Sequence, residues 1–274
     1  RFISERVNQL RKWNMNFVHA DIRKIDEVKK YLNEADVVHH LAGITDVPRT
    51  EFELNDEKDK ELHDIAEKGT EVVLSETSES CKIIFPSTHV VFEGKQDLIK
   101  DIKEDFEKLP ILPYGKSKDF NEDQIKKSGK NYVILRLASV YGYSSDTMRL
   151  NIMPNLFAKI ASQNGTIRLF GGGKQLKALV PLIDVARCFK FMEEKNEIQK
   201  EIFNVSKDSI TVEEVASLCK KINSKYPVVL DEYNKDNNII NVYSFIKKLS
   251  DNLPKKTTVV LANGDIIKTG TRAK

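Results

Sequence analysis

Short apolar segments alternate with amphipathic ones along most of the chain. Residues 35–41, 82–85 and 131–137 are rich in valine, isoleucine and leucine and have the length of buried strands. Between them, apolar residues recur every three or four positions, as on one face of a helix. The alternation predicts an α/β fold, with a parallel sheet and helices on both of its faces.

The same pattern predicts further elements and their ends. We expect strands at 16–21, 35–41, 82–85, 131–137, 166–170 and 202–205 and helices at 25–32, 56–79, 114–127, 151–163, 185–194 and 211–222. Asp184 is expected to cap the helix at 185–194, and Thr211 with Glu214 forms a capping box. Asn263-Gly264 predicts a hairpin turn within residues 257–270.

Composition narrows the class of protein. The chain has 274 residues, of which 40% are hydrophobic and 31% charged, which is typical of a soluble globular protein with one large or two small domains. The net charge is +3 with both signs intermixed, so no basic stripe indicates a nucleic-acid partner. No apolar run is long enough for a membrane span, and the first residues have no signal-peptide core, so we expect a cytoplasmic location.

Histidine and cysteine positions do not indicate a metal site. Adjacent residues on a strand point to opposite faces, so His39 and His40 are poorly placed to bind one ion, and one of them is expected to be buried. Cys81, Cys188 and Cys219 are widely separated, odd in number and form no CxxC pair. They are expected to be free thiols in a reducing compartment.

The strongest candidate for chemistry is the segment Tyr114-Gly115-Lys116-Ser117-Lys118. Residues four positions apart share a helix face, so Tyr114 and Lys118 are expected to lie side by side. A lysine ammonium favours a nearby phenolate and lowers the tyrosine pKa from about 10 toward neutrality. A hydroxyl from Thr88 or Ser87, at the end of the strand at 82–85, could hold the substrate oxygen. These groups suit acid–base chemistry in alcohol oxidation, which a nicotinamide cofactor completes.

These candidate residues lie in an ordered series of strands and helices. The series begins with a strand that leads to Ser87-Thr88. It continues with the YGKSK helix, a second strand and the segment RLASVYG at 136–142. This order resembles extended short-chain dehydrogenases/reductases, and within them the NAD-dependent epimerase/dehydratase family that acts on nucleotide-sugars. The resemblance runs from about Asn16 to about Ile222. It implies a Rossmann-like doubly wound parallel sheet with a smaller C-terminal α/β substrate domain.

Folds of this kind bind the cofactor pyrophosphate with a glycine-rich turn after the first strand. No such turn occurs in the sequence, so we expect the fold to be N-terminally truncated, without its first βαβ unit. We predict a Rossmann-like domain at 1–145, to which 176–200 returns, a substrate-binding domain at 146–250 and an atypical tail at 251–274.

The resemblance also implies roles for particular residues. Thr88, Tyr114 and Lys118 would be catalytic. The cofactor, NAD or alternatively NADP, would contact Asp21, Ile22, Leu41, Ala42, Gly43, Ser87, Leu137 and the same Tyr114 and Lys118. The substrate, a nucleotide-diphosphate-sugar, would contact His89, Ser139 and Lys177. The helix at 56–79 would form the interface of a homodimer.

Departures from the family pattern refine the expected reaction. Sugar dehydratases of the family have Thr-Asp-Glu where this chain has Thr88-His89-Val90, so we favour an epimerase over a dehydratase. A ketoreductase of the same family is one alternative. The other is a non-catalytic or cofactor-deficient binding protein on the same fold, which the missing glycine-rich turn favours.

Overall fold

The computed structural model describes residues 7–8, 10–45, 56–95, 99, 101–143 and 149–225, with side chains to residue 221. The chain divides into two compact units. The first, here called the sheet unit, comprises Phe17–Val140 and Ala178–Ser209. The second, called the helix-pair unit, comprises the described residues of Arg1–Asn16, Tyr141–Lys177 and Ile210–Lys274.

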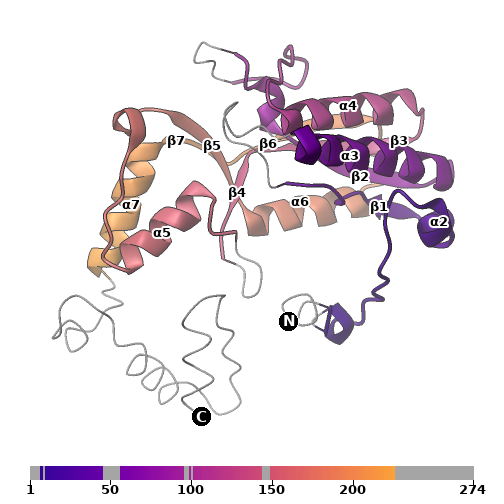
Figure 1. Ribbon diagram of the computed structural model, residues 1–274, viewed down its shortest axis with the longest axis horizontal. Helices are drawn as coiled ribbons and strands as arrows, with labels where there is room; N and C mark the ends of the chain where they lie inside the picture. Colours follow the sequence, from indigo (N-terminus) through magenta and orange to yellow (C-terminus); the bar gives the residue numbers. More distant parts are fainter. Residues whose placement is uncertain are drawn as a thin grey trace. The chain divides into compact units, whose positions relative to one another are not determined.

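A parallel sheet of four strands forms the centre of the sheet unit (Figure 1). The strands lie in the order β1-β2-β3-β6 and every neighbouring pair is parallel. Their bounds are β1 Val37–His39, β2 Lys82–Thr88, β3 Asn131–Leu137 and β6 Glu201–Val205. The register pairs Thr88 with Leu137 and Leu137 with Val205, so three strands end together at the carboxyl edge of the sheet.

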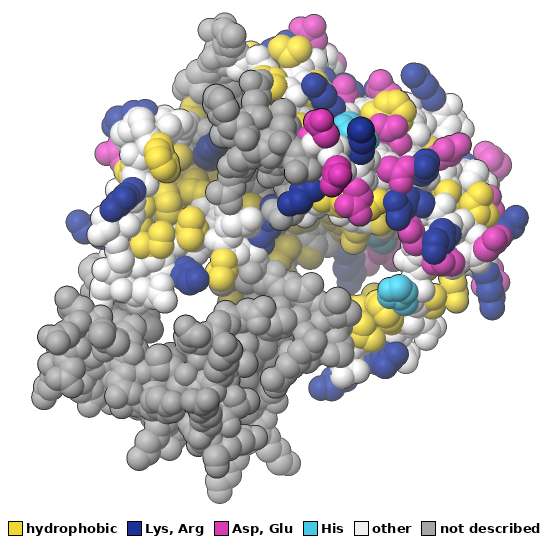
Figure 2. Space-filling view, in the orientation of Figure 1, with side chains coloured by type: hydrophobic (Ala, Val, Ile, Leu, Met, Phe, Trp, Pro, Cys, Tyr) yellow, Lys and Arg dark blue, Asp and Glu magenta, His cyan; other side chains and the backbone are white. Residues whose placement is uncertain are grey.

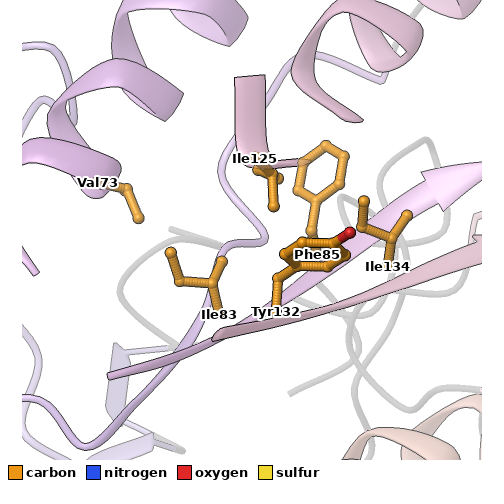
Figure 3. Close-up of a cluster of buried hydrophobic side chains, with 6 residues drawn as sticks. All are labelled: Val73, Ile83, Phe85, Ile125, Tyr132 and Ile134. Carbon is orange, nitrogen blue, oxygen red and sulfur yellow. The ribbon is translucent and has the colours of Figure 1, made fainter. Parts of the chain in front are cut away.

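Helices cover both faces of this sheet. On one face, Val73 of α3 (Asp56–Glu76) and Ile125 of α4 (Pro113–Lys127) pack on Ile83 and Phe85 of β2, together with Tyr132 and Ile134 of β3 (Figure 3). Side chains alternate between the faces of a strand, which is why consecutive apolar residues of β2 serve two different cores.

The second face is covered by α6 (Leu182–Glu194). Ile84 of β2 and Val133 and Leu135 of β3 contact Met192 of α6 there. All four side chains are buried, and burial of one such side chain contributes about 1.5–3 kcal/mol. The helices on two faces confirm the doubly wound parallel sheet predicted from the sequence. A further helix, α2 (Ile25–Asn33), packs against α3.

Two buried lysines stand at the amino ends of the strands. Lys82 donates from Nζ to the carbonyl oxygens of Met192 at 2.6 Å and Lys195 at 2.7 Å, at the end of α6. Lys130 donates to the carbonyl of Thr77 at 2.8 Å, just past the end of α3. The last carbonyls of a helix have no partner within it and carry partial negative charge, so each lysine ties a helix end to the start of a strand.

The helix-pair unit contains α5 (Met153–Ser162) packed against α7 (Val212–Lys225). Thr211 and Glu214 exchange hydrogen bonds at the start of α7, where the Thr211 N–H donates to Glu214 Oε2 at 2.8 Å and the Glu214 N–H to Thr211 Oγ1 at 3.2 Å. The capping box predicted there is confirmed. A short 3-10 helix, η3 (Phe170–Gly173), precedes β5.

Three short strands form a second sheet in the order β4-β5-β7. They are β4 Ser139–Tyr141, β5 Leu176–Pro181 and β7 Asp208–Thr211. Each includes a residue at which the chain passes from one unit to the other.

Three local predictions are wrong. Residues 16–21 and 166–170 are not strands, because neither segment pairs with a strand in the described part of the chain. Asp184 is not a cap: α6 already begins at Leu182, and the Asp184 carboxylate pairs with Arg187 at 3.1 Å. The hairpin expected at 257–270 lies outside the described residues.

Charges of both signs are interspersed over the α2 and α3 side of the sheet unit (Figure 2). Several form ion pairs along one helix, such as Lys68 with Asp64 on α3 at 2.5 Å. Exposed pairs of this kind contribute little to stability, about 0–1 kcal/mol. No helix among the described residues combines the length and the apolar character needed to cross a bilayer.

Candidate active site

The predicted Tyr114–Lys118 pair forms on the first turns of α4. Pro113 occupies the first position of the helix, where its missing N–H costs nothing. Lys118 Nζ lies 5.9 Å from the centroid of the Tyr114 ring, so the two side chains share a face as expected. The same ammonium lies 4.4 Å from the Phe85 ring centroid and donates to the Pro86 carbonyl at 2.8 Å. These contacts hold Lys118 against β2.

Burial makes Lys118 easier to deprotonate than an ordinary lysine. Loss of hydration lowers its pKa from 10.5 to about 8, and the negative charge of Glu122 opposes that effect only in part. The ammonium therefore stands near its titration point in mildly alkaline solution. A cation held beside a phenol in this way can stabilise the phenolate.

The two candidate hydroxyls at the end of β2 have different surroundings. Thr88 is buried, and its Oγ1 accepts a hydrogen bond from the Val90 N–H at 3.2 Å. Thr88 thereby caps η2 (His89–Phe92), the 3-10 turn that follows β2. Ser87 instead donates from Oγ to Glu122 Oε1 at 2.5 Å, inside the protein. The Ser87 hydroxyl belongs to an internal network, which favours Thr88 as the group that faces a substrate.

Three further candidates, His89, Leu137 and Ser139, follow the end of β2 or belong to β3 and β4. His89 donates from Nδ1 to the Leu137 carbonyl at 3.0 Å, because a carbonyl oxygen can only accept. This fixes the ring beside the end of β3. Leu137 and Ser139 are both half-buried, in β3 and β4 respectively. The structure thus brings Thr88, His89 and Leu137 together.

Glu93, which the sequence reasoning did not single out, ties η2 to the start of α4. Its Oε1 accepts from the backbone N–H groups of Ile111 at 2.8 Å and Leu112 at 2.6 Å. The backbone of α4 also approaches closely: a Cβ on Gly115 would stand 3.2 Å from the Val90 carbonyl oxygen. Glycine at this position lets α4 pack directly on the turn that follows Thr88.

A further set of residues that were predicted to contact the cofactor follows β1, at the same edge of the sheet. Leu41, Ala42 and Gly43 are exposed, and Leu41 is 62% exposed although it is apolar. A Cβ on Gly43 would meet no atom within 4 Å. His40, just before them, is buried, as expected for one of the two histidines, and its Nε2 lies 2.9 Å from Thr70 Oγ1.

Asp21 and Ile22, two of the predicted cofactor-binding residues, are in contact with other residues of the protein. Arg23 donates to the Asp21 carboxylate at 2.7 Å and to Asp64 of α3 at 2.7 Å. Hydrogen bonds from Arg23 lower the pKa of Asp21 below its usual range. Ile22 packs against Gly69 of α3.

Lys177, the candidate for binding a diphosphate, is an exposed residue of β5 in the helix-pair unit. The glycine-rich turn before it has left-handed backbone at Gly171, Gly172 and Gly173. Gly173 is buried, and a Cβ there would stand 2.9 Å from the Glu213 N atom, so the turn requires glycine for space as well as for conformation.

Parallel strands with helices on both faces and polar groups at their carboxyl ends define a class of nucleotide-binding α/β proteins. The comparison with protein families is more specific. The chain belongs to the NAD-dependent epimerase/dehydratase family, whose model matches residues 2–206. The family predicted from the motifs is therefore confirmed.

Curated relatives carry epimerase and reductase names. The chain is 30% identical over 191 residues to the “Putative UDP-glucose 4-epimerase” of Methanocaldococcus jannaschii, an alignment that covers 66% of this chain and 60% of the relative. It is 32% identical over 153 residues to the “Probable low-salt glycan biosynthesis reductase” of Haloferax volcanii, covering 55% and 49%. The chain thus spans about half to three fifths of the length of these relatives.

Solved structures show the same fold. The UDP-glucose 4-epimerase of Thermotoga maritima, crystallised with UDP-glucose, has a TM-score of 0.66 and 23% identity, over 77% of this chain and 69% of that one. The UDP-glucose 4-epimerase of Thermus thermophilus in complex with NAD has a TM-score of 0.64 and 20% identity, over 77% and 70%.

Proposed function

We propose that this chain supplies the acid–base site of an NAD(P)-dependent nucleotide-sugar epimerase. The observation that carries the proposal is the Tyr114–Lys118 pair on α4, packed on the strand that ends at Thr88. Epimerase names among the relatives support the substrate class. The proposal also takes the helix-pair unit as the substrate-binding domain. The expected homodimer and the cytoplasmic location stay predictions.

The residues at the carboxyl edge fit a dinucleotide cofactor in part. Leu41, Ala42 and Gly43 offer an exposed apolar surface with open space above the glycine, which suits a flat nucleotide. Lys118 would bind the nicotinamide ribose, and Leu137 would line the site. Ser87 was expected there as well, but its hydroxyl already donates to Glu122. Asp21 fits less well, because Arg23 already occupies its carboxylate.

In the proposed reaction, Tyr114 as phenolate takes the proton of a sugar hydroxyl. Lys118 stabilises the phenolate, and the Thr88 hydroxyl donates to the sugar oxygen and orients it. NAD⁺ bound beside Lys118 would supply the acceptor for a hydride from the sugar carbon, and the hydride would return to the opposite face of the ketone. Tyr114 then gives its proton back to the oxygen of the transient ketone. His89 and Ser139 would contact the sugar, and Lys177 the diphosphate, as a point charge.

A reductase is the second candidate, favoured by the relative from Haloferax volcanii. The same three side chains would serve it, with Tyr114 giving a proton to a carbonyl oxygen. The two reactions differ in outcome, since a reductase consumes the cofactor and an epimerase does not.

Calorimetric titration of the 274-residue chain with NAD⁺, followed by UDP, tests the proposal. We expect NAD⁺ to bind with a micromolar Kd, and UDP to bind to the same preparation. UDP-glucose should then be converted to its epimer, with no net reduction of NAD⁺. UDP binding without NAD⁺ binding would indicate a cofactor-deficient chain, and binding of neither would favour the non-catalytic alternative.

The matched pair of variants for this assay is Tyr114→Phe and Tyr31→Phe. Tyr31 is an exposed tyrosine of α2, away from the carboxyl edge. Tyr114→Phe should lower kcat by at least 10²-fold, since it removes the acid–base group, while the Kd for NAD⁺ stays unchanged. Tyr31→Phe should leave both unchanged. Substantial turnover in Tyr114→Phe would refute the assignment.

A further inference from the structure

Glu122 is a completely buried carboxylate on the catalytic helix. It lies one turn beyond Lys118, as Lys118 lies one turn beyond Tyr114, so the three share a stripe along α4. Arg136 donates to Glu122 from Nε at 3.0 Å and from Nη2 at 2.8 Å, which is the two-pronged geometry of a strong ion pair. Ser87 adds a third hydrogen bond.

Two of the partners of Glu122 immediately precede site residues in the sequence. Ser87 comes just before Thr88 at the end of β2, and Arg136 comes just before Leu137 at the end of β3. Arg136 also donates from Nη1 to the Glu104 carbonyl at 2.8 Å, in the loop before α4. One carboxylate therefore connects α4 to the ends of two neighbouring strands.

We propose that Glu122 is a positioning residue, whose buried carboxylate fixes α4, with Tyr114 and Lys118, against the end of β2 that carries Thr88. The inference rests on the proposed function only in taking Tyr114, Lys118 and Thr88 as catalytic residues. The network and its effect on Lys118 are properties of the folded chain, and they can be measured with no cofactor or substrate.

The charges around the network are opposite in sign and mostly paired. Glu122 faces Arg136 of β3, Lys108 of the loop at 3.4 Å and Lys118 of its own helix. Lys108 also pairs with Asp119 and lies 3.6 Å from Asp123. Burial alone would raise the pKa of Glu122, but the hydrogen bonds from Arg136 and Ser87 outweigh it and hold the pKa low. Lys118 in turn faces Glu122 and His40.

The Phe85 ring reports the position of α4. Lys118 Nζ lies over that ring, so the side-chain protons beside the ammonium should resonate upfield of ordinary lysine. NMR of protein labelled with ¹³C at lysine Cε resolves this signal and its titration, and Lys118→Gln assigns it. We expect Glu122→Ala to remove the upfield shift. Glu122→Gln, which keeps an acceptor oxygen, should retain the upfield shift but lower the midpoint of the titration, because it removes the negative charge.

Two controls separate positioning from general damage. Asp123→Asn removes a neighbouring, partly exposed charge of α4, and Ile125→Val removes a methyl group from the buried face of the same helix. Both should leave the upfield shift in place. The proposal is overturned if Glu122→Ala keeps the shift, or if Ile125→Val loses it as well. Failure of NAD⁺ to bind would count against the proposed function and leave this result untouched.

Discussion

At the scale of single residues, burial destabilises the charged form of Lys118 in the candidate site. Its ammonium is held among Phe85, Tyr114 and the Pro86 carbonyl, where hydration is poor. The folded state therefore disfavours the charged form, and this loss of hydration lowers the pKa of Lys118 to about 8. Placing such a group beside Tyr114 lowers stability, which is a common cost at functional sites and agrees with the proposed role of the pair.

Replacing Lys118 by methionine should change how stability depends on pH. Between the folded pKa of about 8 and the unfolded value of 10.5, the unfolded parent binds more protons than the folded parent, so its stability rises with pH. Lys118→Met lacks this term. We expect the free energy of unfolding of the variant to exceed that of the parent by roughly 2 kcal/mol at pH 7, after allowance for partial exposure of the side chain. This difference should become smaller by pH 10.

Urea unfolding of both proteins at pH 7 and pH 10 measures this difference. The free energies of unfolding are compared at each pH, so that other titrating groups cancel. A difference that does not change between the two pH values would show that Lys118 is not destabilised by burial.

At the scale of elements, the contact between Ile22 and α3 replaces strand pairing. Residues 16–21 form no ladder with the described strands, yet Ile22 packs into the core beside α3. Gly69, in the middle of α3, makes room: a Cβ there would stand 2.8 Å from Ile22 Cγ2. A glycine that weakens the helix in isolation is thus required by its neighbour.

Gly69→Ala should therefore destabilise the protein even though alanine favours helices by about 1 kcal/mol. The overpacking against Ile22 costs about 1–3 kcal/mol, so we expect a net loss of roughly 1 kcal/mol. In an Ile22→Ala background the clash is gone, and the same Gly69→Ala change should stabilise. Thermal unfolding of the four proteins of this double-mutant cycle gives the coupling. Additive effects would mean that the two residues do not compete for space.

The sequence predicted best where one strong pattern decided the outcome. The strand at 131–137 and the helix that carries Tyr114 and Lys118 are where expected, because an apolar run and a Pro at the helix start are local signals. The strand expected at 82–85 also forms, and it continues to Thr88. Residues 16–21 looked like a strand, but a strand also needs a partner, which composition does not supply. Glu122 was missed because its role depends on residues at the ends of two distant strands. Glu93 was missed because its role depends on backbone N–H groups in the loop before α4, far along the chain. The charged Arg136 within an apolar strand was the available signal.

At the scale of the whole molecule, the carboxyl edge of the sheet carries a buried histidine. His40 is almost fully buried, and its Nδ1 has no hydrogen-bond partner among the described residues. Burial lowers its pKa from 6.5 to about 4, and the charge of Lys118 acts in the same direction. The fold therefore holds His40 neutral, at the point where β1 leaves the sheet.

Acid should consequently weaken the sheet unit before its carboxylates are protonated. Between pH 6.5 and about 4 the unfolded chain binds a proton at His40 that the folded chain does not, so stability falls as pH falls. The loss is about 3 kcal/mol at most. His40→Gln, which can still bond to Thr70, should lack this component. Chemical unfolding of both proteins at pH 7 and pH 4.5 checks it, and equal losses in the two would contradict the assignment.

The residues that anchor the helices and the residues of the proposed site lie at opposite edges of the sheet. Lys82 and Lys130 fasten helix ends at the amino edge, whereas Thr88, Tyr114 and Lys118 belong to the carboxyl edge. If the proposed site is correct, substitutions that change its chemistry fall far along the strands from the lysines that anchor the helices. A library of variants that aims to change the substrate of the proposed enzyme is therefore best confined to the carboxyl edge, where it leaves these helix anchors intact.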